Sequence, residues 1–205
     1  EEELFARAQA AASAGACVLF VRNTVDDACA AYRRLRDAPG VTGARLLHAR
    51  FALCDRLTVE DEILRRFGKE GTAEERAGQI LVGTQVLEQS LDIDRDLVCS
   101  DLALIDQLVQ RAGRGHRHAR TDGAGDSLRP EGWREPLCLV LSPRPDDGCG
   151  PDWLKASLPG SAAVYTHHGR MWATARLLAK KPLLRLPEDA RAFIEAVYGP
   201  DARWP

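Results

Sequence analysis

Five short apolar runs are the feature that most constrains the fold of this chain. Residues 16–21 read ACVLFV, an unbroken apolar run of the length of one strand. Continuous runs of this kind are typical of parallel strands that are buried on both faces. Segments with helical periodicity separate the runs, and this alternation predicts an α/β domain with a mostly parallel sheet. The expected strands are residues 16–21, 43–47, 79–82, 97–102 and 137–141.

Polar side chains lie at the ends of four of the expected strands. Ligands of open parallel sheets gather beyond the carboxyl ends of the strands. We therefore expect these side chains to converge on one edge of the sheet, which would be the binding face. They are Arg22, Asn23 and Thr24, then residues 48–50 (HAR), residues 83–85 (GTQ) and Asp101.

The rest of the chain predicts helices around the sheet and an extension after it. Residues 121–135 and 142–161 are rich in Gly, Pro and Asp and show little periodicity, so we expect loops there. We place the core domain at residues 1–142 and a loop and helical extension at residues 143–205. The expected helices are residues 1–14, 25–36, 55–67, 165–180 and 188–198.

Charge and hydropathy limit the partners that the chain can have. The formal net charge is -2, so no global field draws the chain to nucleic acid or to a membrane. Residues 111–120 instead form a local basic cluster, which predicts a patch for an anion. No apolar run approaches the ~20 residues that a membrane helix needs, and no signal peptide is visible.

The sulfur-containing residues indicate the compartment and the extent of the chain. The six cysteines show no CxxC pair and no zinc-ligand spacing. We interpret them as reduced structural thiols in a cytoplasmic protein. The only methionine is Met171 and the chain opens on Glu1. We therefore expect a piece of a longer polypeptide.

Residues 83–117 read GTQVLEQSLDIDRDLVCSDLALIDQLVQRAGRGHR and join a polar block to a helix-like segment that ends in arginines. Arg, Gln and Asp are rarely buried without a partner, so this stretch indicates a polyanionic ligand. With the RNT and HARF that follow the first two strands, it resembles motifs IV, IVa, V and VI of superfamily 2 helicases. QVLEQSLDID followed by SDLALIDQLVQRAGRGHRH is more narrowly similar to the helicase part of the CRISPR-associated helicase–nuclease of type I systems. The resemblance covers about residues 16–141.

The resemblance implies the second RecA-like domain of an ATP-dependent single-stranded DNA translocase or helicase in CRISPR interference. Such a domain is a three-layer sandwich, with ATP in the cleft that it forms with a first RecA-like domain. This chain has no GxxxxGK[ST] phosphate loop, and Asp61 and Glu62 do not form a DExH box. ATP and Mg²⁺ would therefore be held mainly by the absent first domain, and the isolated chain would be inactive. The implied partners are that domain, a nuclease domain of the same polypeptide, single-stranded DNA and a CRISPR RNA-guided surveillance complex.

The resemblance also assigns the catalytic residues. Arg114 and Arg117 would be arginine fingers, which stabilise charge on the transferred phosphoryl group. Gln110 would orient the γ-phosphate or the attacking water. Asp92 would accept a hydrogen bond from the ATP ribose or order the finger. The structural alternative is a solvated helix end whose charges pair with the helix dipole.

A second set of residues would contact DNA. Thr84, with Gln85 beside it, resembles the motif V residue that contacts a DNA phosphate. Asn23, Thr24 and Arg50 are the other phosphate candidates. Such contacts position a strand without reading its sequence, as a translocating motor requires. The alternative is that these residues follow strands and cap the next helix.

Other residues and other functions stay open at this stage. A metal site at His116 and His118 would need a third ligand, and none is in view. Trp133, Trp153 and Trp204 are expected in loops or at the end, where they would pack rather than stack on bases. The chain is alternatively a non-catalytic RecA-like module that binds nucleic acid or protein, or the motor of another superfamily 2 group.

Overall fold

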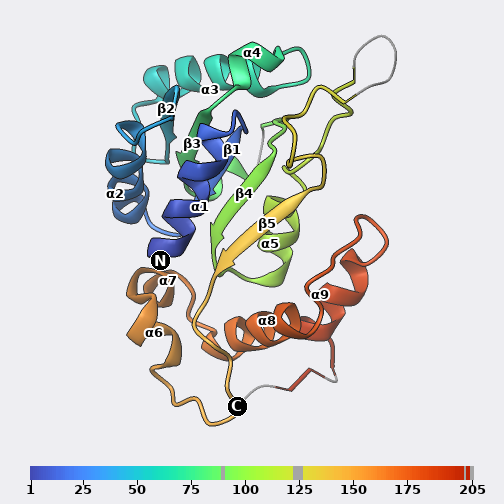
Figure 1. The fold of residues 1–205 in the computed structure, drawn as a ribbon. Coiled ribbons are helices and arrows are strands. Elements are labelled where there is room, and N and C mark those ends of the chain that lie inside the picture. The colour runs from blue at the N-terminus through green and yellow to red at the C-terminus, as the bar shows by residue number, and fades with distance from the viewer. Residues whose placement is uncertain (89–90, 122–126, 201, 204–205) are drawn as a thin grey trace. The chain divides into compact units, whose positions relative to one another are not determined.

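A five-stranded sheet forms the centre of the chain, in the order β2-β3-β1-β4-β5 (Figure 1). The computed structural model describes residues 1–88, 91–121, 127–200 and 202–203, so Ser90 and Trp204 lie outside the described residues. The pairs β1–β3, β1–β4 and β2–β3 are parallel. The predicted α/β fold with a mostly parallel sheet is confirmed. The strands are β1 (Val18–Val21), β2 (Gly43–Leu47), β3 (Gln79–Gly83), β4 (Leu97–Asp101) and β5 (Leu137–Leu141).

Helices cover both faces of this sheet. α1 (Glu2–Ser13) lies on one face, where the Phe5 ring stacks on Phe20 of β1 with 5.0 Å between the centroids. α2 (Val25–Arg36) adjoins α1, because the Arg34 guanidinium lies 4.1 Å from the centre of the Phe5 ring. α3 (Leu53–Phe67) covers the other face, where Phe67 packs in one cluster with Leu19 of β1. Successive strand residues point to opposite faces, so the three-layer arrangement is confirmed.

The remaining elements are short, apart from two helices near the end of the chain. In that region Met171 packs in one apolar cluster with Leu102 and Leu154, and Phe193 packs in another with Ile105. These contacts confirm the helical extension. The elements are α4 (Ala73–Arg76), the 3₁₀ turn η1 (Gln85–Leu87), α5 (Ile105–Ala112), α6 (Trp153–Ser157), α7 (Pro159–Val164), α8 (His168–Lys180) and α9 (Ala190–Tyr198).

Residues 142–161 are not the loop that the sequence predicted. They contain α6 and the start of α7, so Trp153 lies in a helix rather than a loop. Leu154 and Leu158 are buried, and this tertiary packing stabilises helices too short to show periodicity in a Gly- and Pro-rich segment. The helix expected from residue 165 begins at His168, because Tyr165 is extended and donates its hydroxyl hydrogen bond to Gln107.

The chain divides into two compact units. The first unit comprises residues 1–100 and 111–139, and the second comprises residues 101–110 and 140–205. The domain boundary at residue 142 stays a prediction. Among the described residues, no helix combines the length and the apolar character needed to cross a membrane.

Candidate functional site

The carboxyl ends of three neighbouring strands meet at one edge of the sheet. Gly83, the last residue of β3, is in register with both Leu47 of β2 and Val21 of β1. The polar residues that follow these strands therefore begin side by side, and the predicted convergence is confirmed for these three groups. The backbone continues the pairing beyond the strands, because Arg22 N donates to Gly83 O at 2.9 Å and Thr84 N donates to Leu47 O at 3.3 Å.

A buried arginine, Arg111, connects this edge to the end of α5. Its Nε donates to Glu88 at 2.7 Å, its Nη1 to Ser100 Oγ at 2.8 Å and its Nη2 to Asn23 Oδ1 at 3.0 Å. Gln85 adds a fourth contact by donating to Asn23 O at 3.0 Å. The side chain of Asn23, a predicted DNA contact, is thus buried in a protein network. Sequence reasoning assigned no such role to Arg111.

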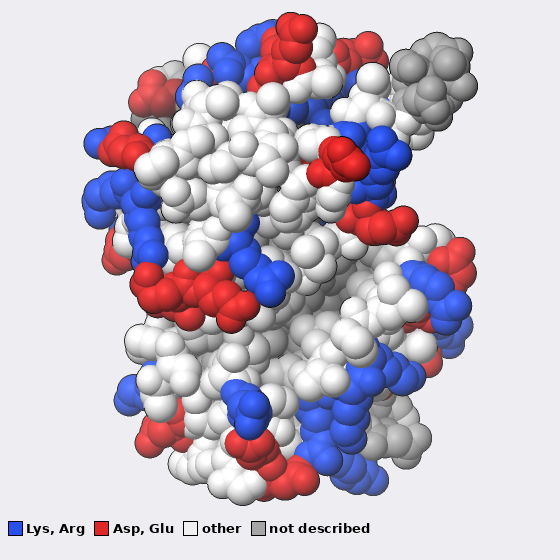
Figure 2. All heavy atoms as spheres, in the orientation of Figure 1, with Lys and Arg blue, Asp and Glu red and all other residues white. Residues whose placement is uncertain are grey.

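Residues 111–120 do not form the surface basic patch that the sequence predicted. Arg111 and Arg114 are buried, and the Arg120 side chain is only 9% exposed. The physical reason is local neutralisation, since Glu88, Asp94 and Asp96 supply carboxylates from the preceding segment. Basic and acidic side chains are likewise interspersed over the face of the molecule seen in Figure 2.

Arg114 turns its guanidinium inward. Its Nη1 donates to Leu91 O at 2.6 Å and its Nη2 to Glu88 O at 2.5 Å. Burial lowers the pKa of Arg114, and the nearby Arg117 charge lowers this pKa further. The backbone is pinned as well, because Arg95 N donates to Arg114 O at 2.9 Å and Arg95 O accepts from His116 N at 2.9 Å. His116 adopts a φ of 50° in this turn.

Arg117 and Asp92 form an exposed pair. The Arg117 side chain is 43% exposed, and its Nε donates to Asp92 Oδ1. His118 Nε2 lies 3.2 Å from the same carboxylate oxygen. The hydrogen bond from Arg117 lowers the pKa of Asp92. Of the two predicted fingers, Arg117 is the one that presents its guanidinium to solvent.

The other predicted site residues lie at α2, η1 and α5 and in the turn that follows β2. Thr24 caps α2, because its Oγ1 accepts from Asp27 N at 3.0 Å. Arg50 is exposed and pairs with Asp26 at 2.9 Å. Thr84 is buried at the start of η1, and Gln110 is exposed near the end of α5. Helix capping thus accounts for Thr24, as the alternative predicted.

A buried cluster of arginines and aspartates lies beside the 111–117 segment. Arg129 contacts Asp94 at 3.0 Å and Asp96 at 2.8 Å, and Arg120 pairs with the same two carboxylates. Arg76 adds a 3.4 Å contact to Asp94. Burial lowers the pKa of Arg120 to about 10, and the charge of Arg129 contributes. Sequence reasoning missed this cluster, and the only signal was the alternation of charge in residues 92–96 (DIDRD).

The side chains that bind metals are dispersed. Among the residues that the structure describes, no three His, Cys, Asp or Glu side chains converge on a point that could hold a metal ion. All six cysteines belong to the described part of the chain and are free thiols, with Cys17 and Cys99 buried.

A family model described as "CRISPR-associated nuclease/helicase Cas3, C-terminal" matches residues 14–120. The chain belongs to this family. The match contains every predicted site residue from Asn23 to Arg117 and confirms the resemblance inferred from the motifs. The chain is 35% identical over 192 residues to the CRISPR-associated endonuclease/helicase Cas3 of Escherichia coli (strain K12), an alignment that covers 92% of the chain and 20% of the relative.

Solved structures agree with the family assignment. The crystal structure of T. fusca Cas3-AMPPNP superposes with a TM-score of 0.81 at 32% identity, covering 98% of this chain and 22% of that one. A chain of a structure described as "CRISPR RNA-guided surveillance complex, pre-nicking" gives a TM-score of 0.68 at 32% identity, covering 90% and 21%. The chain thus spans about a fifth of the length of these relatives.

Proposed function

We propose that this chain is the second RecA-like domain of an ATP-dependent single-stranded DNA translocase or helicase in CRISPR interference. One observation carries the proposal. The 111–117 segment is fixed by the buried side chains of Arg111 and Arg114, while Arg117 keeps an exposed guanidinium paired with Asp92. A permanently charged guanidinium on a rigid backbone segment is suited to stabilise the charge of a phosphoryl group during its transfer.

ATP and Mg²⁺ fit this arrangement only as ligands shared with a neighbouring domain. The chain has no phosphate-loop motif, so a first RecA-like domain would hold the phosphates and the metal. Bound ATP would supply the phosphoryl group for transfer to water. Arg117 would then stabilise charge on that group, and exposed Gln110 would orient the γ-phosphate or the attacking water. Asp92 would order the Arg117 fork, in keeping with their present hydrogen bond.

Arg114 would act as a finger only after exchanging partners. Its guanidinium donates at present to the carbonyls of Glu88 and Leu91, and phosphate oxygens would replace these acceptors when the two domains close. A phosphate adds an ionised acceptor to the ionised guanidinium and can accept two parallel bonds, which favours the exchange. Because the two carbonyls belong to motif V, this exchange would link nucleotide binding to the segment that begins at Thr84.

The DNA contacts are proposed from exposure for Arg50 and from position for Thr84 and Gln85. Arg50 has an exposed guanidinium, and Thr84 with Gln85 lies where the strands end. Asn23 and Thr24 would reach a phosphate only by leaving Arg111 and the α2 cap, respectively. We therefore propose that Arg50, Thr84 and Gln85 carry most of the contact.

The partners follow from the family. We propose that a first RecA-like domain and a nuclease domain belong to the same polypeptide. The relative in the surveillance-complex structure supports recruitment by a CRISPR RNA-guided complex. The isolated chain is expected to hydrolyse no ATP, because half of the nucleotide site is on the partner domain.

The test is ATP hydrolysis by the polypeptide that joins this chain to its first RecA-like domain. Arg114→Ala with Arg117→Ala should lower DNA-stimulated turnover by about 10³–10⁵-fold. Arg191→Ala, which removes another exposed arginine paired with a carboxylate, is the matched control and should leave turnover unchanged. Full ATPase activity in the double variant would refute the motor assignment.

The inward guanidinium of Arg114 also favours a second candidate, a non-catalytic RecA-like module that binds nucleic acid. This candidate predicts salt-sensitive binding of single-stranded DNA by the chain alone, and binding that survives loss of both arginines. The motor predicts instead that hydrolysis depends on both.

A further inference from the structure

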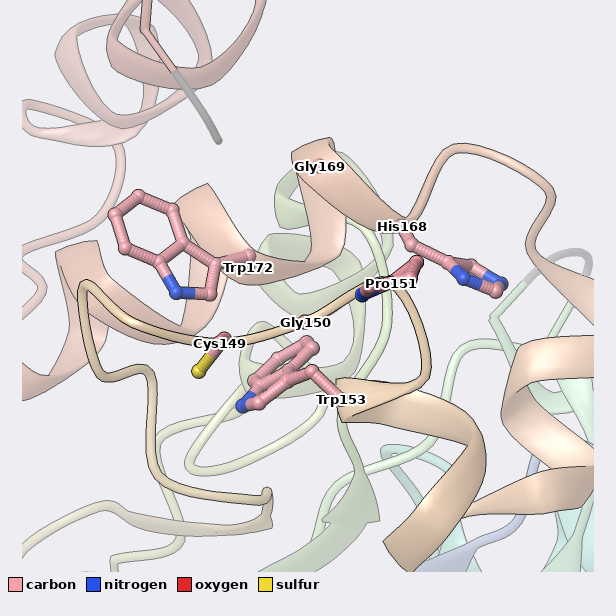
Figure 3. Close-up of a pocket in the computed structure, with 7 residues that line it drawn as sticks. All are labelled: Cys149, Gly150, Pro151, Trp153, His168, Gly169 and Trp172. Atoms are coloured by element: carbon pink, nitrogen blue, oxygen red, sulfur yellow. The ribbon is translucent and has the colours of Figure 1, made fainter.

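A cavity of about 260 Å³ lies in the second unit (Figure 3), and none of the residues assigned above lines it. Trp153 of α6 and Trp172 of α8 contribute indole rings to its wall, and the 149–151 segment passes between these helices. No charged side chain lines it in the described part of the chain. The lining residues are Cys149, Gly150, Pro151, Trp153, His168, Gly169 and Trp172.

Both indole rings are held in place through their N–H groups. Trp153 Nε1 donates to Arg144 O at 2.6 Å, and Trp172 Nε1 donates to Asp146 O at 3.1 Å. The Arg176 guanidinium lies 4.8 Å from the centre of the Trp172 ring and restrains it further. Since the polar atoms of the indoles are occupied and Trp172 is only 7% exposed, what remains for a ligand is the flat surface of Trp153. Trp153 is half-buried, so part of that surface is accessible.

Gly150 lines the cavity and has room for a side chain. A Cβ added at Gly150 would meet no atom within 4 Å, and Gly150 does not have a positive φ. The volume is below the roughly 300–1,000 Å³ that is usual for drug-sized ligands. It therefore suits one flat ring system rather than a larger molecule.

The surrounding segment carries a net positive charge. Residues 142–181 contain six Lys and Arg, three Asp and no Glu, whereas the whole chain has a net charge of -2. Lys155 and Arg170 lie within two residues of lining residues, as do Asp147 and Asp152, so the excess of cations belongs to the segment as a whole. Excess cations attract a phosphate backbone, whereas an apolar protein side chain would need no such excess.

We propose that this cavity stacks one base of a single-stranded nucleic acid, with the backbone drawn by the cations of residues 142–181. The inference rests on the proposed function, which makes single-stranded DNA the substrate, and adds a contact outside the RecA-like sheet. Recognition would be tolerant of sequence, because every base has a π-face and the indole N–H groups are already engaged.

The test measures oligonucleotide binding by the whole chain at low ionic strength. Fluorescence anisotropy would compare an oligothymidylate with an abasic oligomer of equal length, and tryptophan quenching would report stacking. Gly150→Leu should fill the cavity and Trp153→Ala should remove one wall. Each should weaken oligothymidylate binding by roughly 5–150-fold, as expected for one stacked base. Gly148→Leu is the matched control, because its Cβ would also meet no atom within 4 Å but the residue does not line the cavity.

Three results separate the possibilities. Support requires that the loss in Gly150→Leu appear with oligothymidylate and be absent with the abasic oligomer and in Gly148→Leu. Unchanged oligothymidylate binding by Gly150→Leu would overturn the base site and leave the cavity to an apolar side chain of a protein partner. Tryptophan fluorescence of the wild type that is quenched equally by the oligothymidylate and the abasic oligomer would have the same consequence. The ATPase activity of the Arg114 and Arg117 double variant tests the motor separately. Each of the two inferences can therefore be refuted while the other stands.

Discussion

Replacing Arg129 with methionine tests how the buried charge cluster holds the first unit together. The Arg129 side chain is 5% exposed and donates to Asp96 at 2.8 Å, to Asp94 at 3.0 Å and to His118 O at 2.9 Å. Removing one partner of a buried ion pair costs about 3–5 kcal/mol. Arg120 still contacts both carboxylates, so we expect the low end, about 3 kcal/mol.

The assay is urea unfolding followed by circular dichroism, with the free energy extrapolated to water. Arg134→Met is the matched control, because this arginine lies five residues further on and is exposed. It should change the free energy of unfolding by less than about 0.5 kcal/mol. Asp96→Asn combined with Arg129→Met should cost less than the sum of the two single changes, with a coupling of about 0.5–3 kcal/mol. A loss in Arg129→Met as small as that in Arg134→Met would refute the reasoning.

Two further predictions concern single contacts. The hydrogen bond from Arg117 lowers the pKa of Asp92 in the folded chain. The contribution of this pair to stability is therefore present above the unfolded pKa of about 3.9 and is lost as the pH falls through the lower folded value. An NMR titration should show a depressed Asp92 pKa that returns to the ordinary range in Arg117→Ala, and an unshifted value in the wild type would contradict the pairing. Thr24→Ala should lower the free energy of unfolding by about 0.5–2 kcal/mol because it removes the α2 cap, while Thr24→Ser should retain it; equal losses in urea unfolding would exclude capping.

The sheet and the edge where its polar residues meet were predictable because they depend on local pattern. A continuous apolar run such as residues 16–21 has few alternatives to a buried strand. Parallel strands with right-handed connections must place their carboxyl ends together. Asn23, Thr84 and Asp101 could therefore be assigned to one edge before any contact was known. The family resemblance then named Arg114 and Arg117.

The pairing of charges was not predictable in the same way. Arg111, Arg114 and Arg117 are spaced alike along the chain, yet the structure buries two of them and exposes the third. Their environments depend on Glu88 and Asp92, which belong to another segment of the fold. The helices α6 and α7 were not predicted for a related reason. Burial of Leu154 and Leu158 stabilises them, and they are too short to show a periodicity of their own.

Composition and periodicity therefore establish the α/β class, which motif follows which strand along the chain, and the polar side chains available at the sheet edge. These features follow from steric and hydrophobic preferences that act over a few residues. The folded chain alone shows which arginine is presented to solvent, which groups accept hydrogen bonds from the others and where two tryptophans line a cavity. Such contacts join residues that are far apart in the sequence, and their energies exist only once packing has brought the groups together.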